Sequence, residues 1–139
     1  MVELTALIRA VRSEGQSPDD VRAALVDLLS VLSEDVFAHF AREEEVLFPF
    51  VLSAVPELSG DVMSLTLAHD GVCGALSRLG RLVQAEGYAS QFPLVAAMAD
   101  RFADTYAEHA RQERALLSSL AARLTPEQRR EIVELARGL

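Results

Sequence analysis

The sequence has a single cysteine, little positive charge and no long apolar run. Its one cysteine, Cys73, excludes an internal disulfide. The 13 basic residues are outnumbered by 21 acidic ones, and the net charge of −8 argues against nucleic acid or an anionic membrane surface as a partner. The longest apolar run, residues 46–55, is interrupted by Pro49 and Ser53 and is too short to span a bilayer. Because the first residues also lack the pattern of a secretory signal, we expect a cytoplasmic protein.

What the sequence does have is hydrophobic residues at helical spacing. Half of the 139 residues are hydrophobic, which is enough for one sizeable core. Strand patterns are nearly absent, whereas apolar residues recur three and four positions apart along most of the chain. The predicted helices are a short one ended by Gly15, long ones from Pro18 to about Phe48, from Ser59 to about Glu86 and from Pro93 to about Leu124, and a short one that begins at the capping box Thr125 to Gln128.

The connections between these helices are short, and short connections join antiparallel neighbours. We therefore predict an all-α fold, an antiparallel up-down four-helix bundle followed by a short C-terminal fifth helix. No linker or low-complexity segment divides the chain. Residues 1–139 are expected to form a single domain.

Each histidine of the chain is followed four residues later by another potential metal ligand. The three pairs are His39 and Glu43, His69 and Cys73, and His109 and Glu113. On a helix, four residues advance about 400°, so the two side chains of a pair project from one helix toward one point. Each pair also continues the apolar stripe of its helix. Antiparallel packing would then bring the three pairs to a similar depth in the core.

Buried carboxylates and imidazoles each cost several kcal/mol unless they are paired or coordinated. The nearby arginines, Arg42, Arg111 and Arg114, point about 60° or more away from the pairs around their helices. A cation is therefore the natural partner, and mixed imidazole and carboxylate ligands suit iron, manganese or zinc. For any one histidine taken singly, the alternative is an ordinary hydrogen-bonded core residue.

Four other acidic residues lie close to these pairs in the sequence. Glu44 and Glu45 lie more than about 100° from the direction of His39 around the helix. Asp70 and Glu108 each adjoin a histidine and point away for the same reason. All four are expected to face solvent.

Three segments resemble the hemerythrin-like (HHE cation-binding) family. "HFAREEEVLFPF" is similar to the second helix of that family, which carries H-x-x-x-E-E-x-x-L-F-P. "HDGVCGALSRL" resembles its third-helix segment, and "YAEHARQERALL" resembles the H-x-x-x-E of its fourth helix. The resemblance covers roughly residues 2–124 in helix order, and the first of the three motifs is the most specific.

The resemblance implies a bundle that encloses two irons, bridged by an oxo or hydroxo group. Carried over by motif, Glu43 and Glu113 would bridge the two irons. His39 would bind one iron, and His69 and His109 would bind the other. These five residues are the predicted metal ligands, with iron as the predicted cofactor.

The chain departs from the oxygen carriers of that family at two ligand positions. Ala10 and Val11 stand where a first-helix histidine is expected, and Cys73 stands where a second third-helix histidine is expected. The resemblance thus implies open iron positions, or a mononuclear site as the alternative. Cys73 could supply a thiolate or be a small buried apolar residue. Tyr106 lies about 20° from Glu113 on the helix and could reach an iron, or it could be a core residue.

These features predict a non-heme di-iron protein that reacts with O2, peroxide or nitric oxide. Open positions favour reaction over reversible storage, because substrates need vacant sites on the metal. We therefore expect an enzyme that oxidises a small molecule or consumes peroxide or nitric oxide, with Tyr106 and Cys73 as candidate catalytic residues. One alternative is a sensor or carrier without turnover, and another is a metal-free helical interaction module. The positive mean hydropathy leaves room for a homodimer.

Overall fold

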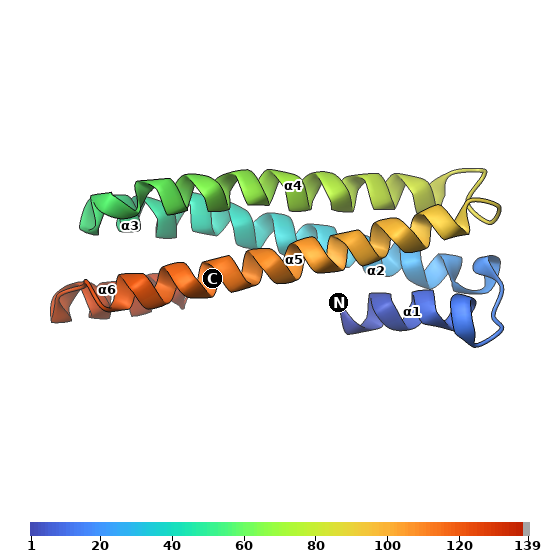
Figure 1. Ribbon diagram of the computed structural model, residues 1–139, viewed down its shortest axis with the longest axis horizontal. Coiled ribbons are helices and arrows are strands. Elements are labelled where there is room, and N and C mark those ends of the chain that lie inside the picture. Colours follow the sequence, from blue (N-terminus) through green and yellow to red (C-terminus); the bar gives the residue numbers. More distant parts are fainter. Residues whose placement is uncertain (138–139) are drawn as a thin grey trace. The chain divides into compact units, whose positions relative to one another are not determined.

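The computed structural model describes residues 1–137, and these residues form helices and connecting turns without a strand (Figure 1). This confirms the predicted all-α class. Over the described residues, no helix combines the length and the apolar character that crossing a membrane requires. The elements are α1 (Val2–Ser13), α2 (Pro18–Arg42), the π-helix η1 (Glu43–Leu47), α3 (Phe48–Ala54), the 3₁₀ turn η2 (Pro56–Leu58), α4 (Ser59–Gln84), α5 (Phe92–Ala121) and α6 (Pro126–Ala136).

Local sequence signals account for the starts of two helices. At the start of α2, the Ser17 hydroxyl accepts from the backbone N–H of Asp20 at 3.3 Å, and the Asp20 carboxylate accepts from the Ser17 N–H at 3.0 Å. At the start of α6, Thr125 and Gln128 form the predicted capping box, with each side chain accepting from the backbone of the other. These bonds satisfy N–H groups that have no partner within the helix.

The predicted end of the second helix is wrong. We expected Pro49 to end the helix near Phe48, but the chain stays helical through η1 and then through α3 to Ala54. Pro49 is the second residue of α3 and directly follows the π-helix, so it lies where the i→i+4 hydrogen-bond pattern is already interrupted. The π-helix before it, with its i→i+5 hydrogen bonds, provides this interruption.

The chain divides into two compact units. Unit 1 comprises Met1–Asp35 and Val72–Tyr106, and unit 2 comprises Val36–Gly71 and Ala107–Leu139. Helices α2, α4 and α5 each contribute one segment to either unit.

Unit 1 is held together by a set of contacts around Arg22 of α2. Its guanidinium donates to the carbonyls of Val83 and Ala85, each at 2.9 Å, and so caps the C-terminal end of α4. The same guanidinium lies 4.9 Å from the centre of the Tyr88 ring. The Tyr88 hydroxyl in turn donates to the carbonyl of Pro18 at 2.6 Å. The chain after α4 is thereby fixed to the start of α2.

Unit 2 has its own apolar core. Its buried members come from η1, α3, η2, α4 and α5, except that Val55 lies between α3 and η2 and Leu124 follows α5. They are Leu47, Phe48, Val51, Val55, Leu58, Val62, Leu65, Leu116, Leu120 and Leu124. Ile132 of α6 packs against this cluster. Because Leu47 ends η1 and Phe48 begins α3, the apolar core starts directly after the acidic run Glu43–Glu45.

Candidate metal centre

The five predicted ligands all belong to unit 2. His39 lies in the last turn of α2, Glu43 is the first residue of η1, His69 lies on α4, and His109 and Glu113 lie on α5. Their potential ligand atoms form two groups of three, each group lying within 4.8 Å. One group is Glu43, His69 and His109, and the other is His39, Glu43 and Glu113. Glu43 belongs to both groups.

Glu43 is fully buried, and its two carboxylate oxygens face two different histidines. Oε1 lies 2.6 Å from Nε2 of His39, and Oε2 lies 2.9 Å from Nε2 of His69. Despite these short distances, neither oxygen of Glu43 has a partner with hydrogen-bond geometry in the part of the chain that the structure describes. Carboxylate oxygens and imidazole nitrogens that lie this close together without hydrogen bonds are arranged as the ligands of a common cation would be.

The group of Glu43, His69 and His109 is closed to solvent. Both ring nitrogens of His109 are buried and lack a hydrogen-bond partner among the described residues, and so does Nε2 of His69. Nε2 of His109 lies 3.4 Å from Oε2 of Glu113. Buried polar groups are rarely left unsatisfied, so the unpaired nitrogens and the unpaired carboxylate fit a bound cation.

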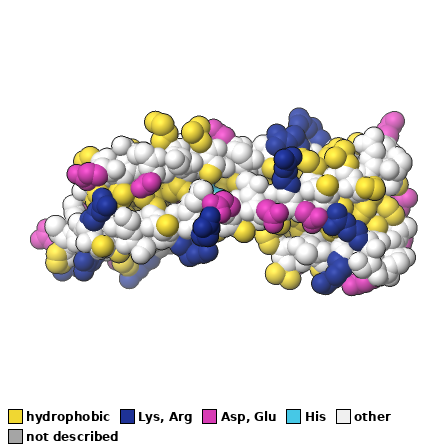
Figure 2. All heavy atoms as spheres, in the orientation of Figure 1, with side chains coloured by type: hydrophobic (Ala, Val, Ile, Leu, Met, Phe, Trp, Pro, Cys, Tyr) yellow, Lys and Arg dark blue, Asp and Glu magenta, His cyan; other side chains and the backbone are white. Residues whose placement is uncertain are grey.

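The second group is open on one side. The His39 side chain is 37% exposed and that of Glu113 is 19% exposed, whereas Glu43 between them is 0% exposed. In Figure 2, almost no histidine surface is visible on the face shown, in keeping with the burial of His69 and His109. A small molecule would therefore approach this centre from the side of His39 and Glu113.

Two phenylalanines enclose the ring of His69. The Phe40 ring stacks on it with 3.8 Å between ring centres and 7° between planes. Phe48 stacks at 5.6 Å and 16°, and Phe40 also meets His109 edge-on at 5.0 Å. These apolar neighbours exclude water from the buried group and fix the plane of the His69 ring.

The charges in the site shift each other's pKa values. Burial raises the pKa of Glu43 above its ordinary value; contact with His69 opposes that shift, and nearby Glu113 reinforces it. Burial acts in the same direction on Glu113, but His109 and Glu43 outweigh it and leave the pKa of Glu113 below its ordinary value. Opposite shifts in two neighbouring carboxyls mean that Glu113 ionises first and Glu43 keeps its proton longer.

The His69 imidazole responds to two glutamates. Burial lowers the pKa of His69, but the contacts with Glu43 and Glu44 outweigh it and leave the pKa above its ordinary value. A cation at Nε2 would replace a proton that the metal-free site holds tightly.

Glu44 is exposed, as predicted, but its side chain also contacts His69, which the sequence did not indicate. Oε1 of Glu44 lies 2.8 Å from Nδ1 of His69 in a hydrogen bond, although the Glu44 side chain is still 39% exposed. The expected direction of Glu44 relative to His39 holds for an ideal α-helix, whereas residues 43–47 form a π-helix, in which each turn is wider. The one available signal was the position of Glu44 directly after Glu43. Asp70, Glu108 and Glu45 are exposed, as predicted.

The structure does not bring the two candidate catalytic residues into the ligand groups. Cys73 and Tyr106 belong to unit 1, and neither is a member of the two groups found among residues 1–137. The Cys73 side chain is of intermediate exposure. The Tyr106 ring lies tilted against Phe102, with 6.1 Å between ring centres. Their catalytic roles stay predictions.

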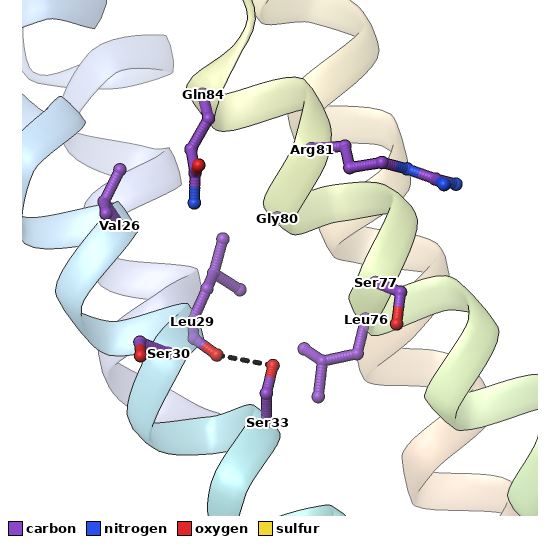
Figure 3. Close-up of a pocket in the computed structure, with 9 residues that line it drawn as sticks. All are labelled: Val26, Leu29, Ser30, Ser33, Leu76, Ser77, Gly80, Arg81 and Gln84. Carbon is purple, nitrogen blue, oxygen red and sulfur yellow. Dashed lines mark hydrogen bonds between the residues drawn. The ribbon is translucent and has the colours of Figure 1, made fainter.

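A cavity of about 350 Å³ in unit 1 is lined by α2 and α4 and contains none of the predicted ligands (Figure 3). Its lining residues are Val26, Leu29, Ser30, Ser33, Leu76, Ser77, Gly80, Arg81 and Gln84. The Ser33 hydroxyl donates to the carbonyl of Leu29 at 2.7 Å, and the Arg81 side chain extends away from the cavity. No carboxylate or imidazole lines it, so it is not the metal centre.

Comparison with known proteins points to one family. A family model described as "Hemerythrin HHE cation binding domain" matches residues 1–121, a stretch that includes all five predicted ligands. No curated protein and no solved structure matches the chain.

Proposed function

Because the chain belongs to the hemerythrin HHE cation-binding domain family, we propose that it is a non-heme di-iron protein that reacts with O2, peroxide or nitric oxide. One ion would be held by Glu43, His69 and His109, and the other by His39, Glu43 and Glu113. Glu43, as the member common to both groups, would be the carboxylate that bridges the ions.

The observation that carries this proposal is the environment of Glu43. Its carboxylate is fully buried, and neither oxygen has a hydrogen bond to the described residues, 1–137, which is strongly unfavourable unless a cation balances the charge. The neighbouring atoms are imidazole nitrogens of His39 and His69, which are themselves metal ligands and supply no permanent charge. Two cations, one beside each oxygen, would satisfy all of these groups together.

The residues around the ions have different roles. Iron bound here would supply electrons and open coordination positions for the oxidant. Phe40 and Phe48 keep water from the inner group, and the partly exposed His39 and Glu113 form the side from which a small oxidant and substrate would enter. With three protein ligands in each group, positions stay open, which favours an oxidase, oxygenase or peroxide- or NO-consuming enzyme over storage.

We also propose that residues 1–139 form one domain of the antiparallel up-down four-helix type. The family match runs through segments of both compact units, and α2, α4 and α5 contribute to both. A shared family domain is the simplest reason for helices that continue from one unit into the other.

The test is iron loading under anaerobic conditions, followed by metal analysis and an absorption spectrum after exposure to air. We expect about two irons per chain and near-ultraviolet absorption from paired ferric ions. A visible charge-transfer band would identify Tyr106 or Cys73 as a ligand, and its disappearance in Tyr106→Phe or Cys73→Ala would decide between them. About one iron per chain would favour the mononuclear alternative.

Matched variants separate specific binding from surface binding. Glu113→Ala should lose iron, whereas Glu108→Ala, which removes an exposed glutamate on the same helix, should load like the wild type. His39→Ala should lose iron as well. Wild-type protein that holds well under one iron per chain, or a His39→Ala variant with unchanged iron content, would overturn the proposal.

A further inference from the structure

Two consecutive glutamates of η1 face the two ring nitrogens of one histidine. Oε2 of Glu43 lies 2.9 Å from Nε2 of His69, and Oε1 of Glu44 lies 2.8 Å from Nδ1 of the same ring. Adjacent residues of an α-helix point about 100° apart, so a regular helix would direct these two side chains differently. The π-helical geometry of residues 43–47 allows both to reach His69.

The aromatic neighbours of His69 fix the plane of its ring but leave its orientation within that plane open. Phe40 lies nearly parallel to the ring, at 7°, and Phe48 at 16°. A rotation of the imidazole by 180° about its Cβ–Cγ bond preserves the plane, and this torsion has two comparable minima. That rotation would exchange the nitrogens for carbons at both edges, so stacking alone does not direct Nε2 toward Glu43.

We propose that Glu44 is a positioning residue for the metal centre. Its carboxylate accepts a hydrogen bond from Nδ1–H of His69 and thereby directs the lone pair of Nε2 at the metal. The inference rests on the proposed function, because it assigns Nε2 of His69 as a ligand. Only one of the two ring orientations gives Glu44 an N–H donor, and in that orientation Nε2 faces Glu43 and His109. Carboxylates that bind the second nitrogen of a ligand histidine also raise its basicity toward the metal.

The exposure of Glu44 makes the role testable without loss of the fold. Its side chain is 39% exposed, so its removal leaves no large cavity and no buried charge. The next residue, Glu45, is exposed and lies in the same π-helix, and its side chain forms no hydrogen bond or ion pair with any residue from 1 to 137. Glu45 therefore provides a matched control for the same chemical change one residue along the chain.

The experiment measures Zn(II) binding by competition with a chromophoric chelator in wild type, Glu44→Ala, Glu44→Gln and Glu45→Ala. Glu44→Ala should weaken Zn(II) binding about 10- to 100-fold, the usual effect of losing such a partner. Glu44→Gln should restore part of the affinity, because its amide oxygen still accepts from Nδ1–H. Glu45→Ala should bind like the wild type.

A second readout follows the His69 ring itself. In Zn(II)-loaded wild type, the Nδ1 proton of His69 should give a downfield NMR signal typical of a hydrogen bond to a carboxylate. This signal should shift in Glu44→Gln. In Glu44→Ala it should be lost because the proton exchanges with water. A Glu44→Ala variant with wild-type affinity and an unchanged His69 signal would overturn this inference alone. Equal losses of Zn(II) affinity in Glu44→Ala and Glu45→Ala would also overturn this inference. Wild-type protein that binds no Zn(II) and no Fe(II) would overturn the proposed function and this inference with it.

Discussion

Nε2 of His69 on α4 lies 2.9 Å from Oε2 of Glu43, the first residue of the π-helix, in a pocket where both side chains are almost fully buried. The two atoms are close enough to bond, yet their geometry is not that of a hydrogen bond. A protein that needed only stability would gain by replacing these groups with apolar ones. Their presence therefore implies a cost in stability that metal binding offsets.

Replacement of Glu43 by leucine should separate stability from metal binding. Glu43→Leu removes a buried carboxyl group whose oxygens form no hydrogen bond with residues 1–137, so the metal-free protein should become more stable by about 1–3 kcal/mol. The same variant should bind no iron. Chemical unfolding in the presence of a chelator measures the first effect, with Glu45→Leu, which changes an exposed glutamate of the same π-helix, as the control near zero. A metal-free Glu43→Leu protein less stable than the wild type would contradict the interpretation.

Metal should stabilise the wild type and leave a ligand variant unaffected. At about 100 times its dissociation constant, a bound ion adds about 2.7 kcal/mol to the free energy of unfolding. Both ring nitrogens of His109 lack a hydrogen-bond partner among residues 1–137, so His109→Ala should abolish this gain. Thermal unfolding with and without Zn(II) measures it. If Zn(II) raised the unfolding temperature of His109→Ala as much as that of the wild type, the metal would bind elsewhere.

Phe40 should affect metal affinity as well as folding. Its ring stacks on His69 and meets His109 edge-on, so Phe40→Leu should weaken metal binding by loosening both ligands. Phe92 in unit 1 is buried to the same degree, 4% exposed like Phe40, and stacks edge-on with Tyr88 instead. Phe92→Leu should therefore lower the unfolding midpoint without changing metal affinity. Equal affinity losses in the two variants would show that general destabilisation is the cause.

Tyr88 should make unit 1 sensitive to alkali. Burial raises the pKa of Tyr88 above its ordinary 10.0; Arg22 opposes the shift but does not cancel it. Because the folded protein holds this proton more tightly than the unfolded chain, the resulting stability is complete below about pH 10 and is lost as the pH rises through the raised pKa. Tyr88→Phe should remove this alkaline loss.

The same variant should cost about 1 kcal/mol at neutral pH, because the carbonyl of Pro18 loses its donor. Unfolding free energies of wild type and Tyr88→Phe, measured from neutral pH to about pH 11, test both statements. Parallel curves for the two proteins would show that another group controls the alkaline transition.

The parts of the fold and site that could be predicted from the sequence are those set by short-range geometry. The pairing of His39 with Glu43, and of His109 with Glu113, follows from the spacing of four residues on an α-helix. The caps at Ser17 and Thr125 depend on residues three positions away. In each case the interacting groups belong to one turn of one helix, so the sequence contains the whole interaction.

The wrong helix end at Pro49 and the unforeseen contact of Glu44 share one cause. Both the continuation of the helix past Pro49 and the contact of Glu44 with His69 depend on the π-helix at residues 43–47. Periodicity arguments assume 3.6 residues per turn and cannot detect a local change in that number. The partner of Glu44 is also 25 residues away in the chain, on another helix, so only tertiary packing reveals it.

The π-helix has a consequence for insertions and deletions. A turn closed by i→i+5 bonds contains one residue more than an α-helical turn, so removal of one residue from this segment would restore a regular helix rather than break it. The extra residue is absorbed within the π turn, so α3 would keep its orientation relative to α2, and Leu47 and Phe48 would stay in the core of unit 2. The deletion would instead change which side chains stand between His39 and Leu47, a stretch that includes Glu43 and Glu44. The length of η1 therefore bears on the positions of these two glutamates rather than on the apolar face of α3.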